Sequence, residues 1–282
     1  MTYKESYERG KKVLAEAGID EAELDARLLL EHVCRTGRSD LLAHGDREVS
    51  LQEEALYLNL LGRRAERIPL QYIVGFQDFM GLEFKVNEQV LIPRQDTEIL
   101  VEEAMKELHD GMDILDLCTG SGCILISLLR YSNDCTGLGV DLSDGALAVA
   151  EENAERLLPD GQVRFLKSDL FETVDGVYDM IVSNPPYIPS GVIGTLMPEV
   201  REYEPLQALD GREDGLHFYR EITGQCRKYL KPGGMLFFEI GYDQGEAVKG
   251  LLSEAGFREV RVIKDYGGLD RVVSGIAPTA SA

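Results

Sequence analysis

The sequence is poor in basic residues. It holds 29 Lys and Arg against 50 Asp and Glu in 282 residues, a formal net charge of -21. Because nucleic acid affinity comes largely from counterion release by Lys and Arg, this composition argues against a general nucleic-acid-coating protein. A local basic strip stays open, since Arg63, Arg64 and Arg67 fall together on one expected helix.

Features of membrane, secreted and metal-binding chains are also missing. No apolar run approaches the roughly 18 residues of a membrane span, and the first residues do not resemble a signal peptide. The five cysteines are odd in number and form no C-x-x-C pair, and the four histidines have no metal-ligand spacing. We therefore expect a cytoplasmic protein with reduced cysteines and no metal.

Residues 1–75 are expected to form a small helical domain. Three residue pairs have the capping-box spacing that begins a helix: Thr2 with Glu5, Asp20 with Glu23, and Ser50 with Glu53. Leu24, Leu28 and Val33, with Leu29 beside them, predict an apolar face on the second helix, and the third should run from Leu51 to about Arg67. This domain holds no catalytic constellation, so a stabilising cap and a docking module for a partner both remain open.

A β-hairpin over residues 76–90 is expected to link this domain to the rest. Phe79, Leu82, Phe84 and Val86 alternate around Met80-Gly81, which is typical of two short paired strands. Strand and helix patterns then alternate over residues 91–282, which predicts an α/β domain with a doubly wound, mostly parallel sheet.

Seven strands are expected in this larger domain. They are 112–117, 136–140, 163–166, 180–182, 235–240, 260–263 and 271–276, and the last two should pair antiparallel across Gly267-Gly268. Helices are expected over 123–131, from after Asp141 to Leu157, over 215–230 and over 244–255. Pro232-Gly233-Gly234 should form a turn before the fifth strand.

Distinctive residues follow each of the first four strands. Gly120 and Gly122 follow the first, Asp141 the second, Asp169 the third and Asn184 the fourth. Ligands of open α/β sheets bind at the carboxyl ends of the strands. Four such markers on one edge therefore predict a ligand site there.

The Gly-rich loop allows two cofactor classes. Gly120-x-Gly122 followed by Asp141 resembles a dinucleotide fingerprint, but the third glycine position is Leu125, and Asp116 lies just before the loop. A carboxylate there would repel a pyrophosphate and suit an ammonium group. S-adenosylmethionine fits better: Asp116 near its methionine end, close backbone approach at the glycines, and Asp141 on the ribose hydroxyls.

The stretch Asn184-Pro185-Pro186-Tyr187 predicts the chemistry of the second substrate. Two prolines make a stiff, extended turn after the fourth strand. Such a turn can present the Asn184 side-chain amide and the Pro185 carbonyl together, with Tyr187 as a nearby wall. A planar amide or amino group needs two acceptors for its two N–H donors and a flat surface to pack on, and this turn can supply both.

With these motifs the chain resembles the release factor glutamine methyltransferases (the HemK/PrmC family), which are class I methyltransferases. The resemblance covers nearly the whole chain, and the matching stretches are 69–73, 91–94, 96–98, 114–122, 168–171, 181–189, 203–205, 239–241 and 270–273. Cys118 stands where the family usually has Gly, and Gln95 where it usually has Pro. Leu170 occupies a place where some members have an aromatic residue, which predicts weaker stacking on adenine.

The resemblance implies both substrates and the residues that bind them. S-adenosylmethionine should contact Asp116, the loop Cys118-Thr119-Gly120-Ser121-Gly122, Asp141, Asp169, Leu170 and Asn184. The methyl acceptor should be the glutamine amide nitrogen (N5) in the Gly-Gly-Gln motif of peptide chain release factors. Asn184, Pro185, Pro186 and Tyr187 should bind it, with Asn184, Pro185 and Tyr187 in catalytic roles.

Two further expectations concern partners, and two alternatives to the proposed function stay open. The helical domain and the hairpin are the parts outside the shared catalytic domain, so we expect them to dock the release factor, and we expect a monomer. The alternative acceptor is an adenine amino group of DNA or RNA, because such enzymes share the four-residue turn. A catalytically idle module that binds a release factor or the ribosome is a third possibility, which the intact Asn184 turn disfavours.

Overall fold

The computed structural model describes residues 1–158 and 161–278. The chain forms two compact units: Met1–Phe76 with Met197–Tyr203, and Gln77–Leu196 with Glu204–Ala282. A short segment from late in the sequence, Met197–Tyr203, thus groups with the helical N-terminal unit rather than with the residues on either side of it.

The first unit is helical. Its N-terminal elements are α1 (Tyr3–Glu16), α2 (Ala22–Cys34), α3 (Arg38–Ala43), α4 (Leu51–Ala65) and α5 (Leu70–Val74). The capping boxes at Thr2 and Ser50 are confirmed, with both reciprocal hydrogen bonds present in each. The capping box expected at Asp20 is wrong, because the cap of α2 is Glu21 and its side chain makes no capping hydrogen bond.

The apolar face of α2 differs from the expected one. Leu24 is 37% exposed, whereas Leu29 and Leu30 are fully buried. The buried face packs around Tyr57 of α4, whose hydroxyl donates to the Ala26 carbonyl at 3.0 Å. A Cβ at Gly10 of α1 would lie 2.0 Å from that hydroxyl oxygen, so only glycine fits there. On this face a small residue, Ala26, lies next to the tyrosine.

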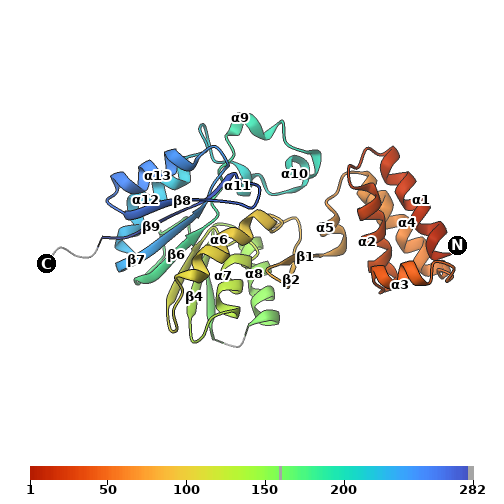
Figure 1. Ribbon diagram of the computed structural model, residues 1–282, viewed down its shortest axis with the longest axis horizontal. Coiled ribbons are helices and arrows are strands. Elements are labelled where there is room, and N and C mark those ends of the chain that lie inside the picture. Colours follow the sequence, from red (N-terminus) through yellow and green to blue (C-terminus); the bar gives the residue numbers. More distant parts are fainter. Residues whose placement is uncertain (159–160, 279–282) are drawn as a thin grey trace. The chain divides into compact units, whose positions relative to one another are not determined.

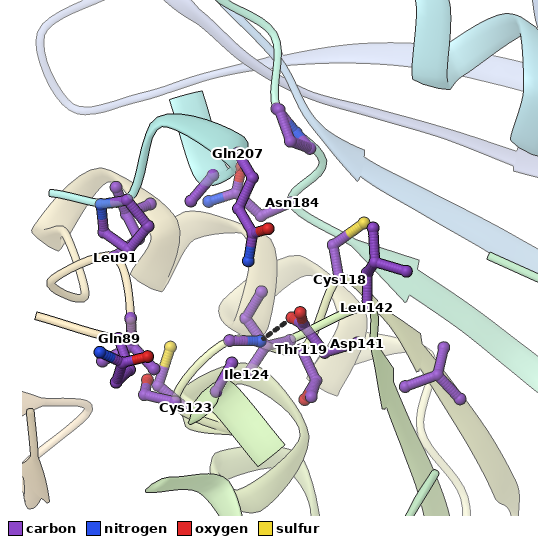
Figure 2. A pocket seen from close by; sticks show the side chains of 18 of the residues that line it. Gln89, Leu91, Cys118, Thr119, Cys123, Ile124, Asp141, Leu142, Asn184 and Gln207 are labelled. Carbon is purple, nitrogen blue, oxygen red and sulfur yellow. Dashed lines mark hydrogen bonds between the residues drawn. The ribbon is translucent and has the colours of Figure 1, made fainter. Parts of the chain in front are cut away.

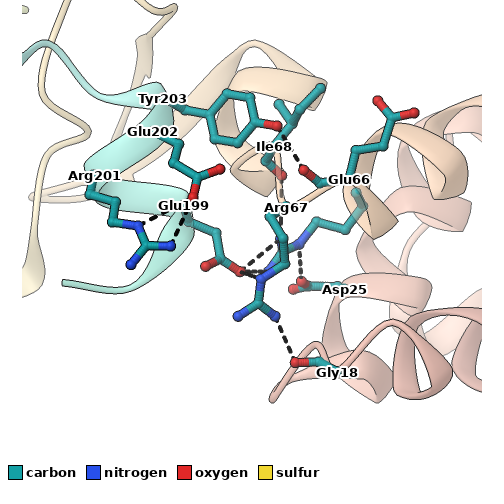
Figure 3. A network of polar contacts seen from close by, with 10 residues as sticks. Gly18, Asp25, Glu66, Arg67, Ile68, Glu199, Arg201, Glu202 and Tyr203 are labelled. Carbon is teal, nitrogen blue, oxygen red and sulfur yellow. Dashed lines mark hydrogen bonds and ion pairs between the residues drawn. The ribbon is translucent and has the colours of Figure 1, made fainter. Parts of the chain in front are cut away.

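A buried ionic cluster holds α10 (Pro198–Tyr203) within the helical unit (Figure 3). Arg64 donates from Nε to Asp25 Oδ2 at 2.7 Å, and from Nη1 and Nη2 to Glu199 Oε1 at 3.1 Å each. Arg67 Nε lies 3.4 Å from the same oxygen. The basic strip considered for this helix is therefore wrong, because two of its three arginines are neutralised by these carboxylates.

The second unit begins with a β-hairpin, β1 (Phe76–Phe79) and β2 (Leu82–Lys85). Met80 and Gly81 form its turn with φ of 51° and 73°, the left-handed pair that matches the twist of two-residue hairpins. The predicted hairpin is confirmed, and Phe79 and Phe84 are buried in the core of the α/β unit.

The central sheet has seven strands among the described residues, in the order β5-β4-β3-β6-β7-β9-β8. They are β3 (Asp113–Leu117), β4 (Thr136–Asp141), β5 (Val163–Lys167), β6 (Tyr178–Ser183), β7 (Leu230–Glu239), β8 (Arg258–Lys264) and β9 (Asp270–Ile276). Strands β3 to β7 pair in parallel, and β9 pairs antiparallel with β7 and β8. The expected fold class and the final antiparallel pair are confirmed.

Helices cover both faces of this sheet (Figure 1). One face carries α6 (Gln95–Lys106), α7 (Cys123–Arg130) and α8 (Asp144–Leu157), and the other carries α12 (His217–Gln225) and α13 (Gly245–Glu254). Side chains alternate between two cores: Ile114, Val182 and Phe237 lie on the α6–α8 side, and Leu115 and Ile181 on the α12–α13 side.

Several elements differ from the sequence expectation. Strand β7 begins at Leu230 and includes Pro232-Gly233-Gly234, and its pairing with β6 shifts register there, so the predicted turn is wrong. The expected helix over 215–230 is shorter: α12 ends at Gln225, and a 3-10 turn, Cys226–Lys228, follows. Helix α6 and the short α9 (Ser190–Ile193) and α11 (Leu206–Leu209) were not anticipated. Throughout residues 1–158 and 161–278, each helix is too short or too polar to cross a membrane.

Candidate active site

One pocket of the α/β unit lies at the carboxyl ends of β3 to β6 (Figure 2). Nine of the residues predicted for the site line it: Cys118, Thr119, Gly120, Ser121, Asp141, Asp169, Leu170, Asn184 and Pro186. Asp116, Gly122, Pro185 and Tyr187 are not among the residues that line the pocket. The structure therefore brings both predicted binding regions, the Gly-rich loop and the turn, to one cavity.

The loop after β3 turns sharply through left-handed residues. Cys118 has φ of 60°, Gly120 of 55° and Gly122 of 78°. A Cβ at Gly122 would lie 2.8 Å from Ile126 Cδ1, so this glycine is needed both for its backbone angle and for close packing on α7. Cys118 adopts the left-handed conformation without being glycine, which gives a physical reason for the glycine usual at this place in the family.

Asp116 lies fully buried at the base of the loop. Its Oδ2 accepts from the Thr119 hydroxyl at 2.6 Å. Oδ1 makes no hydrogen bond of ordinary geometry within the described residues, although the Leu125 backbone N–H also acts on the carboxylate. Burial raises the pKa of Asp116 to about 7, and the nearby Asp141 charge adds to that rise. Asp116 thus lies beneath the loop, outside the pocket lining, as a carboxylate that a nearby cation would stabilise.

Asp141 ends β4 and is already hydrogen-bonded on both oxygens. Oδ2 accepts from the Gly120 backbone N–H at 2.9 Å, the dashed contact in Figure 2, and Oδ1 accepts from the Ser143 N–H at 2.9 Å. Burial raises its pKa, and these two backbone donors oppose the rise. The Leu142 backbone N–H also acts on this carboxylate. These bonds fix Asp141 at the edge of the pocket, where the carboxylate can still accept from a ligand hydroxyl.

The loop after β5 adds Asp169 and Leu170. Asp169 is exposed, while Leu170 is buried in the pocket wall with φ of 48°. A leucine in this conformation is uncommon and costs conformational energy.

Asn184 follows β6 and is half-buried in the pocket lining. Its Nδ2 donates to Thr97 Oγ1 of α6 at 3.4 Å. The strand end before it is fixed, because the Ser183 hydroxyl donates to the Leu117 carbonyl at 2.7 Å. Pro185 and Pro186 are both buried. The amide is therefore anchored from its nitrogen side on a rigid backbone.

Tyr187 packs against the core on the α12–α13 side, and its hydroxyl donates to Glu239 Oε1 at 3.2 Å. Burial, followed by the Glu239 charge, raises the pKa of Tyr187. Glu239 is itself buried, and burial raises its pKa to about 6. The tyrosine hydroxyl is thus committed to a neighbouring carboxylate in this structure.

Sequence reasoning about the site did not anticipate two other parts of the pocket wall. The segment before α6 contributes Gln89 to Leu91, Pro93 and Arg94, and α6 itself contributes Thr97. The segment around α11 contributes Pro205, Gln207 and Ala208. Arg94 donates to the buried Glu204 at 2.5 Å, which ties these two segments together. Several of these residues lie inside the stretches that carried the family resemblance, so that signal was available.

Comparison with known proteins identifies both parts of the chain. The PrmC N-terminal domain model matches residues 5–75, and the methyltransferase small domain model matches residues 94–195. The release factor glutamine methyltransferase of Geobacter sulfurreducens is 45% identical over 93% of this chain and 92% of its own length. That of Caulobacter vibrioides is 43% identical over 98% and 96%.

Solved structures support the fold at lower identity. A methyltransferase from Pyrococcus furiosus superposes with a TM-score of 0.54 at 18% identity, covering 71% of this chain and 91% of its own. The Thermus thermophilus 16S rRNA N2 G1207 methyltransferase, solved with AdoMet and guanosine, gives 0.50 at 20% identity over 72% of this chain and 49% of its own. The sheet is thus that of the class I methyltransferases, and with relatives above 40% identity along nearly its whole length the chain belongs to the release factor glutamine methyltransferase family.

Proposed function

We propose that this enzyme transfers a methyl group from S-adenosylmethionine to the side-chain amide nitrogen of the glutamine in the Gly-Gly-Gln motif of peptide chain release factors. The observation that carries the proposal is the convergence of Asn184 with the Gly120 loop and Asp141 in one pocket. Full-length similarity to release factor glutamine methyltransferases supports the choice of acceptor.

The residues of the pocket fit S-adenosylmethionine. The buried Oδ1 of Asp116 lacks a hydrogen bond of ordinary geometry in the described part of the chain, and an ammonium group would satisfy it. Asp141 suits ribose hydroxyls, and the Gly120 loop lets the ligand approach the backbone. The negative charges of Asp141 and Asp169 in the lining would repel a pyrophosphate. Arg94, a cation of the pocket wall, would not offset them, because it is already paired with Glu204.

When bound, S-adenosylmethionine supplies a methyl group activated by its sulfonium. The protein's task is to position the acceptor, because the amide lone pair is delocalised and the described residues that line the pocket include no strong base beside Asn184. Asn184 Oδ1 and the Pro185 carbonyl accept the two hydrogens of the substrate amide and orient its nitrogen. Pro186 in the lining, and Tyr187 beside it, bound the plane of the substrate. Release of the amide proton to water completes the transfer.

Release factor docking is assigned to the helical unit and the hairpin, because a glutamine on a protein loop needs contacts beyond its own side chain. Such contacts contribute to positioning in the transition state as well as to affinity. The net charge of -21 favours a partner with basic, RNA-facing surfaces and faster association at low salt. The enzyme acts as a monomer in the cytoplasm, where translation takes place.

Mass spectrometry of purified release factor, incubated with the enzyme and S-adenosylmethionine, tests the function. We expect one added methyl on the Gly-Gly-Gln glutamine. A release factor carrying Ala in place of that glutamine is the matched control and should gain none. Duplex DNA and RNA are incubated in parallel; methyl transfer to nucleic acid alone would establish the adenine alternative instead.

A further inference from the structure

A chain of polar contacts behind the turn determines which end of the Asn184 amide faces the pocket. The Asn184 side chain has a donor end, Nδ2, and an acceptor end, Oδ1, and only the acceptor end can receive a substrate N–H. In the structure Nδ2 faces Thr97 Oγ1 at 3.4 Å, so Oδ1 is left for the pocket. Whether that orientation is maintained depends on the Thr97 hydroxyl.

Thr97 has a single hydroxyl proton, which cannot serve two acceptors. The Thr97 hydroxyl lowers the pKa of Glu239, and the buried Glu239 Oε2 has no hydrogen bond of ordinary geometry within residues 1–158 and 161–278, so this oxygen is available to accept one. A hydroxyl proton goes preferentially to a charged acceptor, because charge-assisted hydrogen bonds are about twice as strong as neutral ones. Thr97 must then accept from Asn184 rather than donate to it.

The surroundings of Glu239 keep its carboxylate in place as the final acceptor. It lies at the end of β7, fully buried, and the Tyr187 hydroxyl donates to Oε1 at 3.2 Å. Arg271 of β9 faces it as a cation and lowers its pKa, while Asp96 of α6 raises it. Arg271 is itself held by Asp96 at 3.1 Å and Asp265 at 3.2 Å. These contacts fix the carboxylate, and Glu239 itself is not among the residues that line the pocket.

We propose that Thr97 and Glu239 are positioning residues for the methyl transfer: the Glu239 carboxylate accepts a hydrogen bond from the Thr97 hydroxyl, and Thr97 Oγ1 thereby accepts from Asn184 Nδ2 and holds the Asn184 oxygen toward the acceptor amide. The inference rests on the proposed function and deepens it, since it explains how a site without a strong base selects an N–H donor. Neither residue needs to touch the reacting atoms.

Protonation of Glu239 would reverse the direction of these hydrogen bonds, which we call the relay from Glu239 through Thr97 to Asn184. A neutral Glu239 can donate a hydrogen bond to Thr97 Oγ1. The Thr97 hydroxyl can then donate to the oxygen of the Asn184 amide, which turns the Asn184 N–H groups toward the pocket. The N–H groups of Asn184 and the N–H groups of the substrate amide would then face each other, with no acceptor between them. Glu239→Gln should reproduce this state at every pH, because the Tyr187 hydroxyl donates to the amide oxygen and leaves the amide N–H groups toward Thr97.

Kinetics of three variants test the proposal. We expect Thr97→Val to lower kcat on the order of tenfold, the effect of one lost hydrogen bond, with the dissociation constant for S-adenosylhomocysteine within about twofold. Thr97→Ser should restore kcat. Wild-type kcat should fall as pH drops through about 6, whereas Glu239→Gln should be slow and flat with pH. Thr223→Val is the matched control, because the buried Thr223 hydroxyl has no hydrogen-bond partner among the described side chains and lies outside the pocket lining.

A direct readout separates this proposal from the proposed function. The side-chain NH2 signals of Asn184, assigned with Asn184→Ala, report its hydrogen bonding by NMR in the enzyme alone. They should shift and exchange faster with water in Thr97→Val and in Glu239→Gln, and not in Thr223→Val. Unchanged Asn184 signals, or wild-type kcat in Thr97→Val, would overturn the relay. Failure of the wild-type enzyme to methylate release factor, with the NMR result intact, would instead overturn the choice of substrate.

Discussion

Arg64 holds Glu199, a residue 135 positions away in the sequence, with two guanidinium nitrogens at 3.1 Å from one carboxylate oxygen. Both side chains are buried, and Asp25 supplies the second carboxylate at 2.7 Å. The next residues of the chain after α10 are Glu204, buried against Arg94, and Pro205, in the pocket wall. Helix α10, which carries Glu199, thus ends at Tyr203, two positions before Pro205 of the pocket wall.

Removing Glu199 should destabilise the helical unit. Glu199→Ala leaves Arg64 buried with one carboxylate instead of two, so we expect a loss of about 3 kcal/mol in unfolding free energy, the scale for breaking a buried ion pair. Urea unfolding followed by circular dichroism measures it. The control is Arg63→Ala on the same helix, an exposed arginine whose loss should change stability by about 0.5 kcal/mol or less. Equal stability of both variants would show that the cluster adds nothing.

Asn184→Ala should remove most turnover and leave the fold unchanged. Loss of one preorganised polar group predicts a decrease in kcat on the order of 10²–10³. Steady-state methylation of release factor measures the rate, and near-UV circular dichroism checks the fold. Near-normal turnover of the variant on release factor would refute the role assigned to this amide.

Asp141→Ala should weaken cofactor binding. Its carboxylate organises the Gly120 and Ser143 N–H groups as well as facing the pocket, so the predicted loss is about 1–3 kcal/mol, the range for a hydrogen bond to a charged group and its unpaired partners. Calorimetry with S-adenosylmethionine and with NAD measures it. Asp144→Ala, which removes an exposed carboxylate nearby, should bind S-adenosylmethionine as the wild type does. Tight NAD binding by the wild type would contradict the cofactor assignment.

The sequence was most informative where local rules agree with the tertiary environment. Capping boxes at Thr2 and Ser50 and the Met80-Gly81 turn depend on neighbouring residues alone, and all three form as predicted. The parallel order of strands followed from alternation of strands and helices. The carboxyl-edge rule then brought Asn184 and Asp141 to one pocket, although they lie on different strands.

Predictions failed where distant residues decide the outcome. Leu24 fits an apolar helical face, but Tyr57 from another helix selects a different face. From the sequence Arg64 resembles a surface charge, but in the structure it is hydrogen-bonded to Glu199, which lies far along the chain. Strand β7 runs through Pro232 because a register shift with β6 accommodates it. The proposed relay through Thr97 could not be inferred from sequence, because Thr97 of α6 and Glu239 at the end of β7 lie far apart in the chain.

The unusual buried acid at position 116 predicts a pH dependence of cofactor binding. The pKa of Asp116 is about 7 in the folded protein, above the value near 3.9 of an unfolded chain, because burial disfavours its charged form. Its ionisation therefore costs stability as pH rises through about 7, the reverse of a salt-bridged carboxylate. A bound ammonium group needs the ionised form, so S-adenosylmethionine affinity should rise with pH, by up to about tenfold per pH unit below 7.

Calorimetric titrations with S-adenosylmethionine between pH 5.5 and 8.5 measure this dependence. Asp116→Asn should bind weakly and without the slope, and its thermal stability at pH 8 should equal or exceed that of the wild type, since no charge is buried. Methylthioadenosine, which lacks the amino acid end of the cofactor, is the matched ligand and should bind both proteins with little pH dependence. If its affinity follows the same slope as that of S-adenosylmethionine, the titrating group does not face the ammonium, and Asp116 acts only in shaping the loop.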